Sequence, residues 1–138
     1  MKKLLLILPV LAIILASCSS DDDSVTPSEA TSTLTSDQWR ISYYWDKDKD
    51  ETSDYSGYVF TFNDDGSLTA VKGSVTVSGS WSVYSSDGYT KLDIDFGTAE
   101  PLSEFNDDWK ILEQTSAEIK LEDQSGSGGT ETLHFVKI

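Results

Sequence analysis

The sequence has very little of the side-chain chemistry that most metal, redox and nucleophilic sites need. Its 138 residues include one cysteine, Cys18, and one histidine, His134. A lone cysteine excludes an intramolecular disulfide, and a single histidine without a second thiol cannot build a typical zinc or copper site. The Gly-x-Ser-x-Gly elbow of many serine hydrolases is also absent. The sequence therefore predicts no enzyme and no cofactor.

Basic residues are also scarce. The chain has 10 Lys and Arg against 24 Asp and Glu, for a net charge of −14. Nucleic-acid binding needs clustered positive charge, so this composition predicts no nucleic-acid partner. An anionic membrane surface would repel the same chain.

The N-terminus has no apolar run long enough to span a bilayer, but it does have the layout of an export signal. Lys2 and Lys3 precede an apolar stretch over 4–15, and small residues lead to Cys18. A spanning helix needs about 20 apolar residues, so residues 1–17 are predicted to be a cleaved signal peptide. The ending Leu-Ala-Ser-Cys resembles a lipobox, which implies a lipid-modified Cys18 that anchors the protein to a membrane.

Residues 18–33 are predicted to be a disordered tether, because they are rich in Ser, Thr and Asp and almost lack large apolar residues. The acidic run 21–23 resembles that of surface-exposed lipoproteins in the Bacteroidetes. The resemblance implies an outer-membrane protein exposed at the cell surface. A protein that faces the periplasm is the alternative.

Residues 34–138 carry no long helical pattern, but alternation of apolar and polar residues recurs between turn sequences. This pattern predicts one all-β domain. Eight sequential strands with short connections favour an antiparallel up-and-down meander that closes into a barrel. The predicted strands are 38–45, 57–62, 67–72, 75–84, 89–96, 108–114, 117–122 and 130–137.

The order of several short motifs resembles the lipocalin-like lipoproteins of the Bacteroidetes. These motifs are Trp39, Phe-x-Phe-Asn-x-x-Gly at 60–66, Gly-x-Trp at 79–81, Leu-x-Ile-x-Phe at 92–96, Trp109 and Leu-His-Phe-x-Lys at 133–137. The resemblance implies an eight-stranded barrel of the lipocalin type. Asp37 stands where secreted lipocalins have the glycine of their first Gly-x-Trp motif.

In such a meander, the long loops 46–56, 97–107 and 123–129 lie at one end with the short loop 73–74. Long loops on a rigid scaffold favour an open mouth and a binding site. A mouth there would take a small molecule or a glycan. The candidate ligand-binding residues are Tyr43, Trp45, Tyr58, Phe105 and Trp109.

A different interpretation stays open, because an eight-stranded barrel is just wide enough for side chains to fill. Under it, the aromatic residues pack the core. The protein would then be a structural or interaction lipoprotein that docks on a protein of the cell envelope.

Acidic residues gather in the loops of the same predicted mouth. Asp46, Asp48 and Asp50 are a weak calcium candidate, because the EF-hand pattern fails at its sixth and twelfth positions. Asp93 and Asp95 share the outer face of strand 89–96, where no cleft is expected. They are therefore not predicted to form the carboxylate pair of a glycosidase.

Overall fold

The fold is seen in a computed structural model that describes residues 25–124 and 129–138. The signal peptide and residues 18–24 of the predicted tether, Cys18 among them, lie outside the described residues. The helical elements are α1 (Pro27–Ser36), η1 (Thr52–Tyr55) and η2 (Leu102–Phe105). The strands are β1 (Gln38–Asp46), β2 (Lys49–Asp50), β3 (Val59–Phe62), β4 (Ser67–Lys72), β5 (Val75–Ser86), β6 (Tyr89–Asp95), β7 (Asp107–Gln114), β8 (Glu118–Asp123) and β9 (Glu131–Lys137). None of the described helices is long and apolar enough to cross a membrane.

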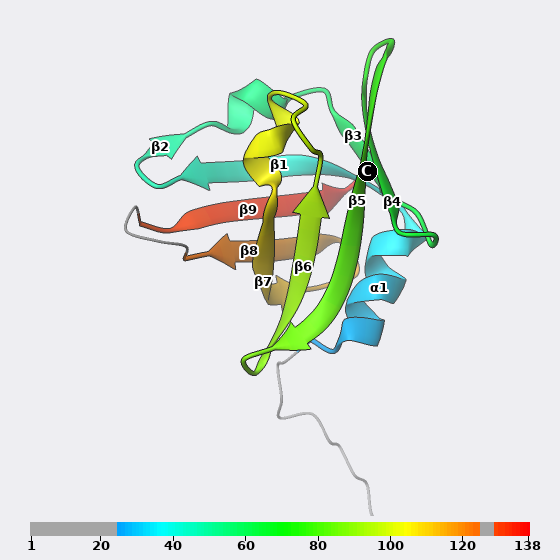
Figure 1. Ribbon diagram of the computed structural model, residues 1–138, viewed down its shortest axis with the longest axis vertical. Helices are drawn as coiled ribbons and strands as arrows, with labels where there is room; N and C mark the ends of the chain where they lie inside the picture. The colour runs from blue at the N-terminus through cyan, green and yellow to red at the C-terminus, as the bar shows by residue number, and fades with distance from the viewer. Residues whose placement is uncertain (1–24, 125–128) are drawn as a thin grey trace, which may run out of the picture.

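Eight of these strands form a closed antiparallel barrel, as the sequence predicts (Figure 1). Each strand from β3 to β8 pairs with the next along the chain, and β1 pairs with both β3 and β9. The short β2 adds an antiparallel pair to the end of β1. The β5–β6 hairpin turns at Asp87 and Gly88, both with positive φ, which is the conformation that Asp-Gly turns supply. The predicted fold class is confirmed.

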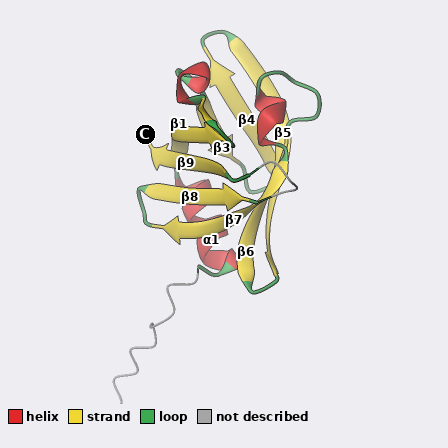
Figure 2. Cartoon of the chain, turned by 90° about the vertical axis from the view of Figure 1, so that its left-hand side faces the viewer, coloured by secondary structure: helices red, strands yellow, loops and turns green. Residues whose placement is uncertain are grey.

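The two ends of the barrel differ in what covers them. One end, which we name the helix end, is covered by α1 and carries the short turns (Figure 2). The other, which we name the loop end, carries the longer connections that contain η1 and η2. The chain enters the described part at Val25, whose carbonyl accepts a hydrogen bond from Thr90 Oγ1 at the helix end.

Helix α1 corrects the prediction of a disordered tether over residues 27–33, and the part of that prediction before Val25 lies outside the described residues. Thr26 caps the helix and Glu29 closes a capping box, while Pro27 occupies the first turn. Ala30 and Leu34, four residues apart on one face, are fully buried against the barrel. Ala30 and Leu34 therefore dock the helix on the barrel, together with hydrogen bonds from Gln114 to Glu29 and Thr33, although its average composition is polar.

A bulge in β1 changes which of its aromatic residues point inward. The pairing with β9 shifts register between Ile41 and Tyr43. The inserted residue moves the inward position to Tyr44, which is fully buried. Tyr43 and Trp45 are only half-buried. Regular alternation over 38–45 predicts Trp39, Tyr43 and Trp45 on one face of the strand, and the bulge makes that prediction wrong.

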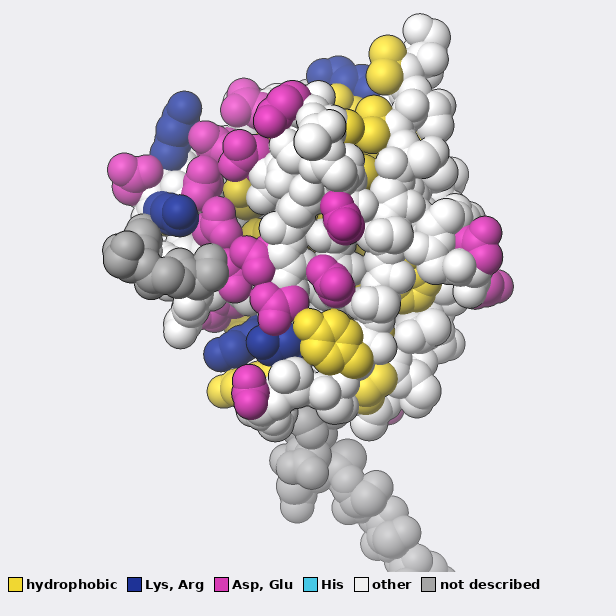
Figure 3. Space-filling model, in the orientation of Figure 1, with side chains coloured by type: hydrophobic (Ala, Val, Ile, Leu, Met, Phe, Trp, Pro, Cys, Tyr) yellow, Lys and Arg dark blue, Asp and Glu magenta, His cyan; other side chains and the backbone are white. Residues whose placement is uncertain are grey.

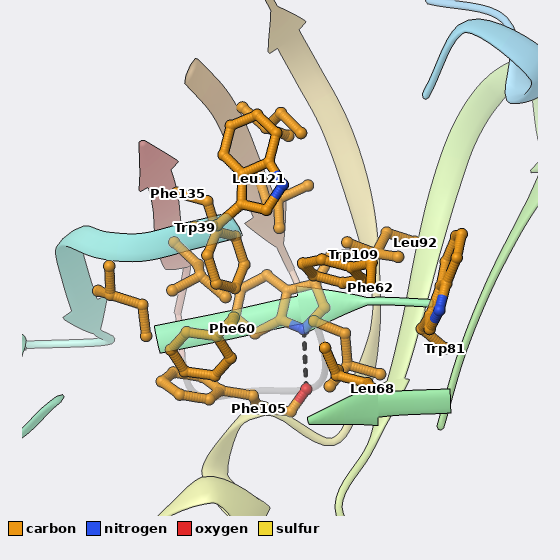
Figure 4. Close-up of a cluster of buried hydrophobic side chains, with 14 of the residues drawn as sticks. Trp39, Phe60, Phe62, Leu68, Trp81, Leu92, Phe105, Trp109, Leu121 and Phe135 are labelled. Carbon is orange, nitrogen blue, oxygen red and sulfur yellow. Dashed lines mark hydrogen bonds between the residues drawn. The ribbon is translucent and has the colours of Figure 1, made fainter. Parts of the chain in front are cut away.

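The interior of the barrel is packed with large side chains (Figure 4). Phe60 contacts Phe135 with ring centroids 5.3 Å apart, and Phe62 contacts Phe135 at 5.8 Å. The largest side chains that are fully buried are Trp39, Trp109, Tyr44, Phe60, Phe62, Phe105, Phe135, Leu34, Leu68, Leu92, Ile94 and Leu102. Interiors of this kind are close-packed, so these side chains fill the space that a lumen ligand would need.

Candidate functional site at the loop end of the barrel

Three aromatic side chains close the loop end. Tyr55 of η1 and Phe105 of η2 lie with ring centroids 4.4 Å apart, and both contact Tyr44, at 5.5 and 4.9 Å. The Tyr55 hydroxyl donates to the carbonyl of Pro101, 3.2 Å away, which joins the two loops. Burial raises the pKa of both tyrosines well above its usual value. We name this group the aromatic plug; it stands where the sequence predicts an open mouth.

The five candidate ligand-binding residues do not surround one opening. Phe105 and Trp109 are fully buried, and the Trp109 indole N–H donates to the Phe105 carbonyl at 2.9 Å (Figure 4). Tyr58 is 9% exposed. Tyr43 packs on the ring of His134 at 5.2 Å, and Trp45 lies beside it on the same strand. Their predicted placement around a single mouth is wrong, and a ligand-binding role for any one of them stays a prediction.

Carboxylates from three neighbouring strands converge at the rim of the loop end. Asp107 begins β7, Asp123 ends β8 and Glu131 begins β9, and one oxygen of each lies within 4.8 Å of the others. We name these three residues the carboxylate cluster. Asp123 is directly opposite Glu131 in the β8–β9 pair, and Asp46 is directly opposite Glu131 in the β1–β9 pair. Like charges in such positions repel each other and destabilise a sheet.

Burial and mutual repulsion change the titration of this cluster. Burial and the neighbouring Asp123 raise the pKa of Asp107 to about 7. Burial and the neighbouring Asp46 raise the pKa of Glu131 to about 7. Asp123 is 7% exposed, and its Oδ2 atom is buried without a hydrogen-bond partner among residues 25–124 and 129–138.

The calcium candidate of the sequence, Asp46, Asp48 and Asp50, does not gather in this way. Asp48 and Asp50 are exposed, and Asp50 is used locally, since its Oδ1 accepts from the backbone N–H and hydroxyl of Thr52 at 2.9 and 2.6 Å. Only Asp46 lies beside the carboxylate cluster. Glu131 was missed by the sequence analysis. The sequence does hold one signal for it. Asp123 and Glu131 flank a single loop between two predicted strands, and antiparallel strands place the residues on either side of such a loop opposite each other.

An acidic groove runs along the outer face of β6 and β7 near the loop end. Its volume is about 500 Å³, and it is lined by Tyr84, Asp93, Ile94, Asp95, Asn106, Asp107 and Asp108. Burial and the charges of Asp108 and Asp95 raise the pKa of Asp93. Figure 3 shows Asp and Glu side chains crowded on this side of the molecule. The expectation that Asp93 and Asp95 lie where there is no cleft is therefore wrong.

One lysine forms an ion pair with a carboxylate that lines this groove. Lys91 Nζ lies 3.0 Å from Asp108 Oδ2, and this contact raises the pKa of the lysine and lowers that of the carboxyl. Asn106 fixes the wall of the groove, because it accepts from the Phe96 N–H at 2.6 Å and donates to the Gly97 carbonyl at 2.8 Å. The groove thus combines a rigid wall with a surplus of negative charge.

The carboxylate cluster does not have the geometry of a glycosidase site. Its oxygens lie within 4.8 Å of one another, whereas retaining and inverting enzymes hold their carboxyl groups about 5 Å or more apart across an open cleft. Asp123 is almost wholly buried, so a sugar ring cannot pass between the three groups. Acid–base catalysis also needs pKa values that are pushed apart, but those of Asp107 and Glu131 are alike.

A second groove, of about 410 Å³, lies at the helix end. Its apolar residues include Val25, Pro27 and Ile111, together with Tyr89 and Leu112, which are 46% and 49% exposed. Lys110 Nζ lies 4.3 Å from the centroid of the Tyr89 ring, a cation–π distance. This groove was not predicted, because its wall includes the start of the unexpected helix α1.

These observations define a small closed antiparallel barrel with a filled interior and acidic surface features at one end. No protein-family model matches the chain, and no curated protein matches it in sequence. Solved structures do match in fold. A DUF4847 family protein from Bacteroides vulgatus has a TM-score of 0.52 at 15% identity, covering 78% of this chain and 96% of that one. At this identity the likeness shows a shared fold alone.

Two other solved structures come from related bacteria. A lipocalin-like protein from Bacteroides uniformis has a TM-score of 0.49 at 14% identity, covering 77% of this chain and 99% of that one. A protein described as uncharacterized, from Bacteroides eggerthii, has a TM-score of 0.48 at 16% identity, covering 74% and 98%. The predicted resemblance to proteins of the Bacteroidetes is confirmed as a likeness of fold by the Bacteroides vulgatus structure, and the strand order shows the predicted closed antiparallel barrel independently.

Proposed function

We propose that this protein is a lipid-anchored, non-enzymatic binding module of the outer membrane that docks on a basic surface of another envelope protein. The observation that carries the proposal is the filled interior, with α1 at one end of the barrel and the aromatic plug at the other. A binding module without a lumen has to bind through its outer surface. The acidic groove on β6 and β7 is the surface best suited to that role.

The charge of the groove favours a cationic partner. Asp93, Asp95 and Asp107 place like charges beside one another, two of them on exposed residues, and Lys91 offsets only Asp108 at close range. A neutral sugar would leave the repulsion among these carboxylates in place, whereas lysine or arginine side chains would relieve it. Complementary charge also steers association, with a strong dependence on salt.

The position of the groove fits an anchored protein. Lipid on Cys18 would hold the chain at the membrane, and the described part begins at Val25, at the helix end. The groove lies toward the opposite end, so it would face away from the bilayer. We propose exposure at the cell surface on the basis of the acidic run 21–23; the partner could be reached there without crossing the membrane.

The test is a titration of the full-length chain, held in neutral detergent, with a fluorescent hexalysine peptide at low salt. The double variant Asp93→Asn/Asp95→Asn should weaken binding by about 10-fold, which corresponds to about 1.4 kcal/mol. The matched control Asp64→Asn/Asp87→Asn removes the same charge from exposed turns at the helix end and should weaken it far less. Equal loss in both variants would reject the groove as the docking surface.

A second candidate function is the binding of a small apolar molecule, and the groove at the helix end favours it. Its volume of about 410 Å³ lies within the range of ligand pockets. An apolar fluorescent probe should then bind with a saturable signal that Leu112→Asp abolishes. The signal would persist in Asp93→Asn/Asp95→Asn, which separates this function from the first.

A further inference from the structure

Three carboxylates at the loop end converge in a way that folding alone does not require. The β8–β9 hairpin places Asp123 directly opposite Glu131, and Asp107 approaches both from β7. Such pairs of like charge cost stability unless something lies between them. Among the described residues, no lysine or arginine forms an ion pair with any of the three. Lys47 acts on Glu131 only through its longer-range charge.

Asp123 provides a second, independent observation. The residue is 7% exposed, and its Oδ2 atom is buried with no hydrogen-bond partner in the part of the chain that the structure describes. A buried carboxylate oxygen without a partner carries a large desolvation cost. The carboxyl group points into the cluster, since its oxygen lies within 4.8 Å of those of Asp107 and Glu131. A cation between the three groups would supply the missing partner.

We propose that Asp107, Asp123 and Glu131 form a divalent-cation site, and that calcium is the ion it takes. Calcium binds oxygen ligands at about 2.3–2.6 Å, so two oxygens on one ion lie at most about 5 Å apart. The three oxygens of the cluster lie within 4.8 Å of one another, which is inside this distance of about 5 Å. Carboxylate oxygen is also the ligand that hard cations prefer, and the cluster holds no nitrogen or sulfur ligand that would select zinc or copper.

The site would join three strands at the end of the barrel where the longest loops begin. Three carboxylates offer up to six oxygens, and water completes the shell of six to eight. Asp46 lies opposite Glu131 and adds negative charge at the rim without being required as a ligand. The site shares Asp107 with the acidic groove, but it can be tested separately from the docking function, because Asp123 and Glu131 do not line that groove.

The experiment is an isothermal titration of the full-length chain, in neutral detergent and freed of metal by a chelator, with calcium chloride. One saturable site is expected, with a Kd on the order of 10⁻⁴–10⁻³ M, the range of extracellular calcium modules. Magnesium should bind more weakly, because it gives up its water reluctantly. Asp123→Asn should weaken calcium binding by at least about 10-fold, whereas Asp64→Asn, with the same loss of charge at a distant exposed turn, should not change it.

Thermal unfolding gives a second measurement of calcium binding, and it also shows whether each variant is folded. Calcium should raise the Tm of the original protein and of Asp64→Asn, because an ion that binds only the native state stabilises it. The rise should vanish in Asp123→Asn and in Glu131→Gln, each checked for its fold by circular dichroism. The proposal is overturned if no saturable binding occurs, or if both variants bind calcium and gain stability as the original protein does.

Discussion

Replacing Phe105 by alanine tests whether the aromatic plug is part of the core. The Phe105 ring is fully buried and lies 4.4 Å from the Tyr55 ring and 4.9 Å from the Tyr44 ring. Removing a buried phenylalanine costs about 3–5 kcal/mol, from lost burial and from the cavity that remains. A domain of this size has about 5–15 kcal/mol of stability, so Phe105→Ala should still fold at 25 °C.

The assay is equilibrium unfolding in urea, followed by tryptophan fluorescence, with the full-length chain in neutral detergent. Phe105→Ala should lower the free energy of unfolding by about 3–5 kcal/mol and leave the slope with urea unchanged. Tyr89→Ala is the control, because this aromatic ring is 46% exposed and should cost no more than about 1 kcal/mol. A loss below about 1 kcal/mol in Phe105→Ala would refute the reasoning, since the ring would then belong to a loop that leaves the mouth open.

Two further predictions concern backbone packing and pH. A methyl group on Gly79 would meet the Asp95 carbonyl oxygen and come within 2.8 Å of Phe96 Cδ1, so Gly79→Ala should lower stability by about 1–3 kcal/mol in the same urea assay. The raised pKa values of Asp107 and Glu131 mean that the native state binds more protons than the unfolded chain between their ordinary values and about 7. In the absence of calcium, the contribution of these two carboxyl groups to the free energy of unfolding is therefore fully present below about pH 4. It is lost as the pH rises through 7. The Tm should therefore fall as the pH rises toward 7, and Glu131→Gln should make this fall smaller. An unchanged dependence of Tm on pH would contradict the raised pKa of Glu131.

The strands were predictable because each is read from a local pattern. Alternation over 89–96 puts Leu92 and Ile94 inside and Asp93 and Asp95 outside, and the structure has this arrangement. The Asp-Gly turns then mark where one strand of a hairpin ends and the next begins. Even the weak strand predicted over 67–72 has the predicted bounds.

The helix and the bulge show where local patterns fail. Helix α1 lies in a segment whose average composition is polar, and only the Thr26-Pro27-x-Glu29 capping sequence marks it. The bulge at Ser42 has no signal in the sequence, because alternation continues through Tyr43 and Trp45 as though the strand were regular. Its register is set by the pairing with β9, which is 92 residues away in the chain.

Asp123 and Glu131 flank one loop, but the complete carboxylate cluster was beyond sequence reasoning for a related reason. Asp107, Asp123 and Glu131 come from three strands, and with 24 acidic residues in the chain no spacing singles them out. What distinguishes Asp123 is its burial without a hydrogen-bond partner. That property depends on the packing of the closed barrel and can be read only once the strands are assembled.

Exchange of the indole N–H hydrogens with solvent, followed by NMR in the full-length chain, tests the sealed barrel most directly. The indole of Trp39 donates to the Leu34 carbonyl beneath α1, and that of Trp109 donates to the Phe105 carbonyl behind the aromatic plug. Both should exchange as slowly as the amides of the central strands, while half-buried Trp45 exchanges quickly. If Trp109 exchanged as fast as Trp45 while the strand amides stayed protected, the mouth would be open and the central claim wrong.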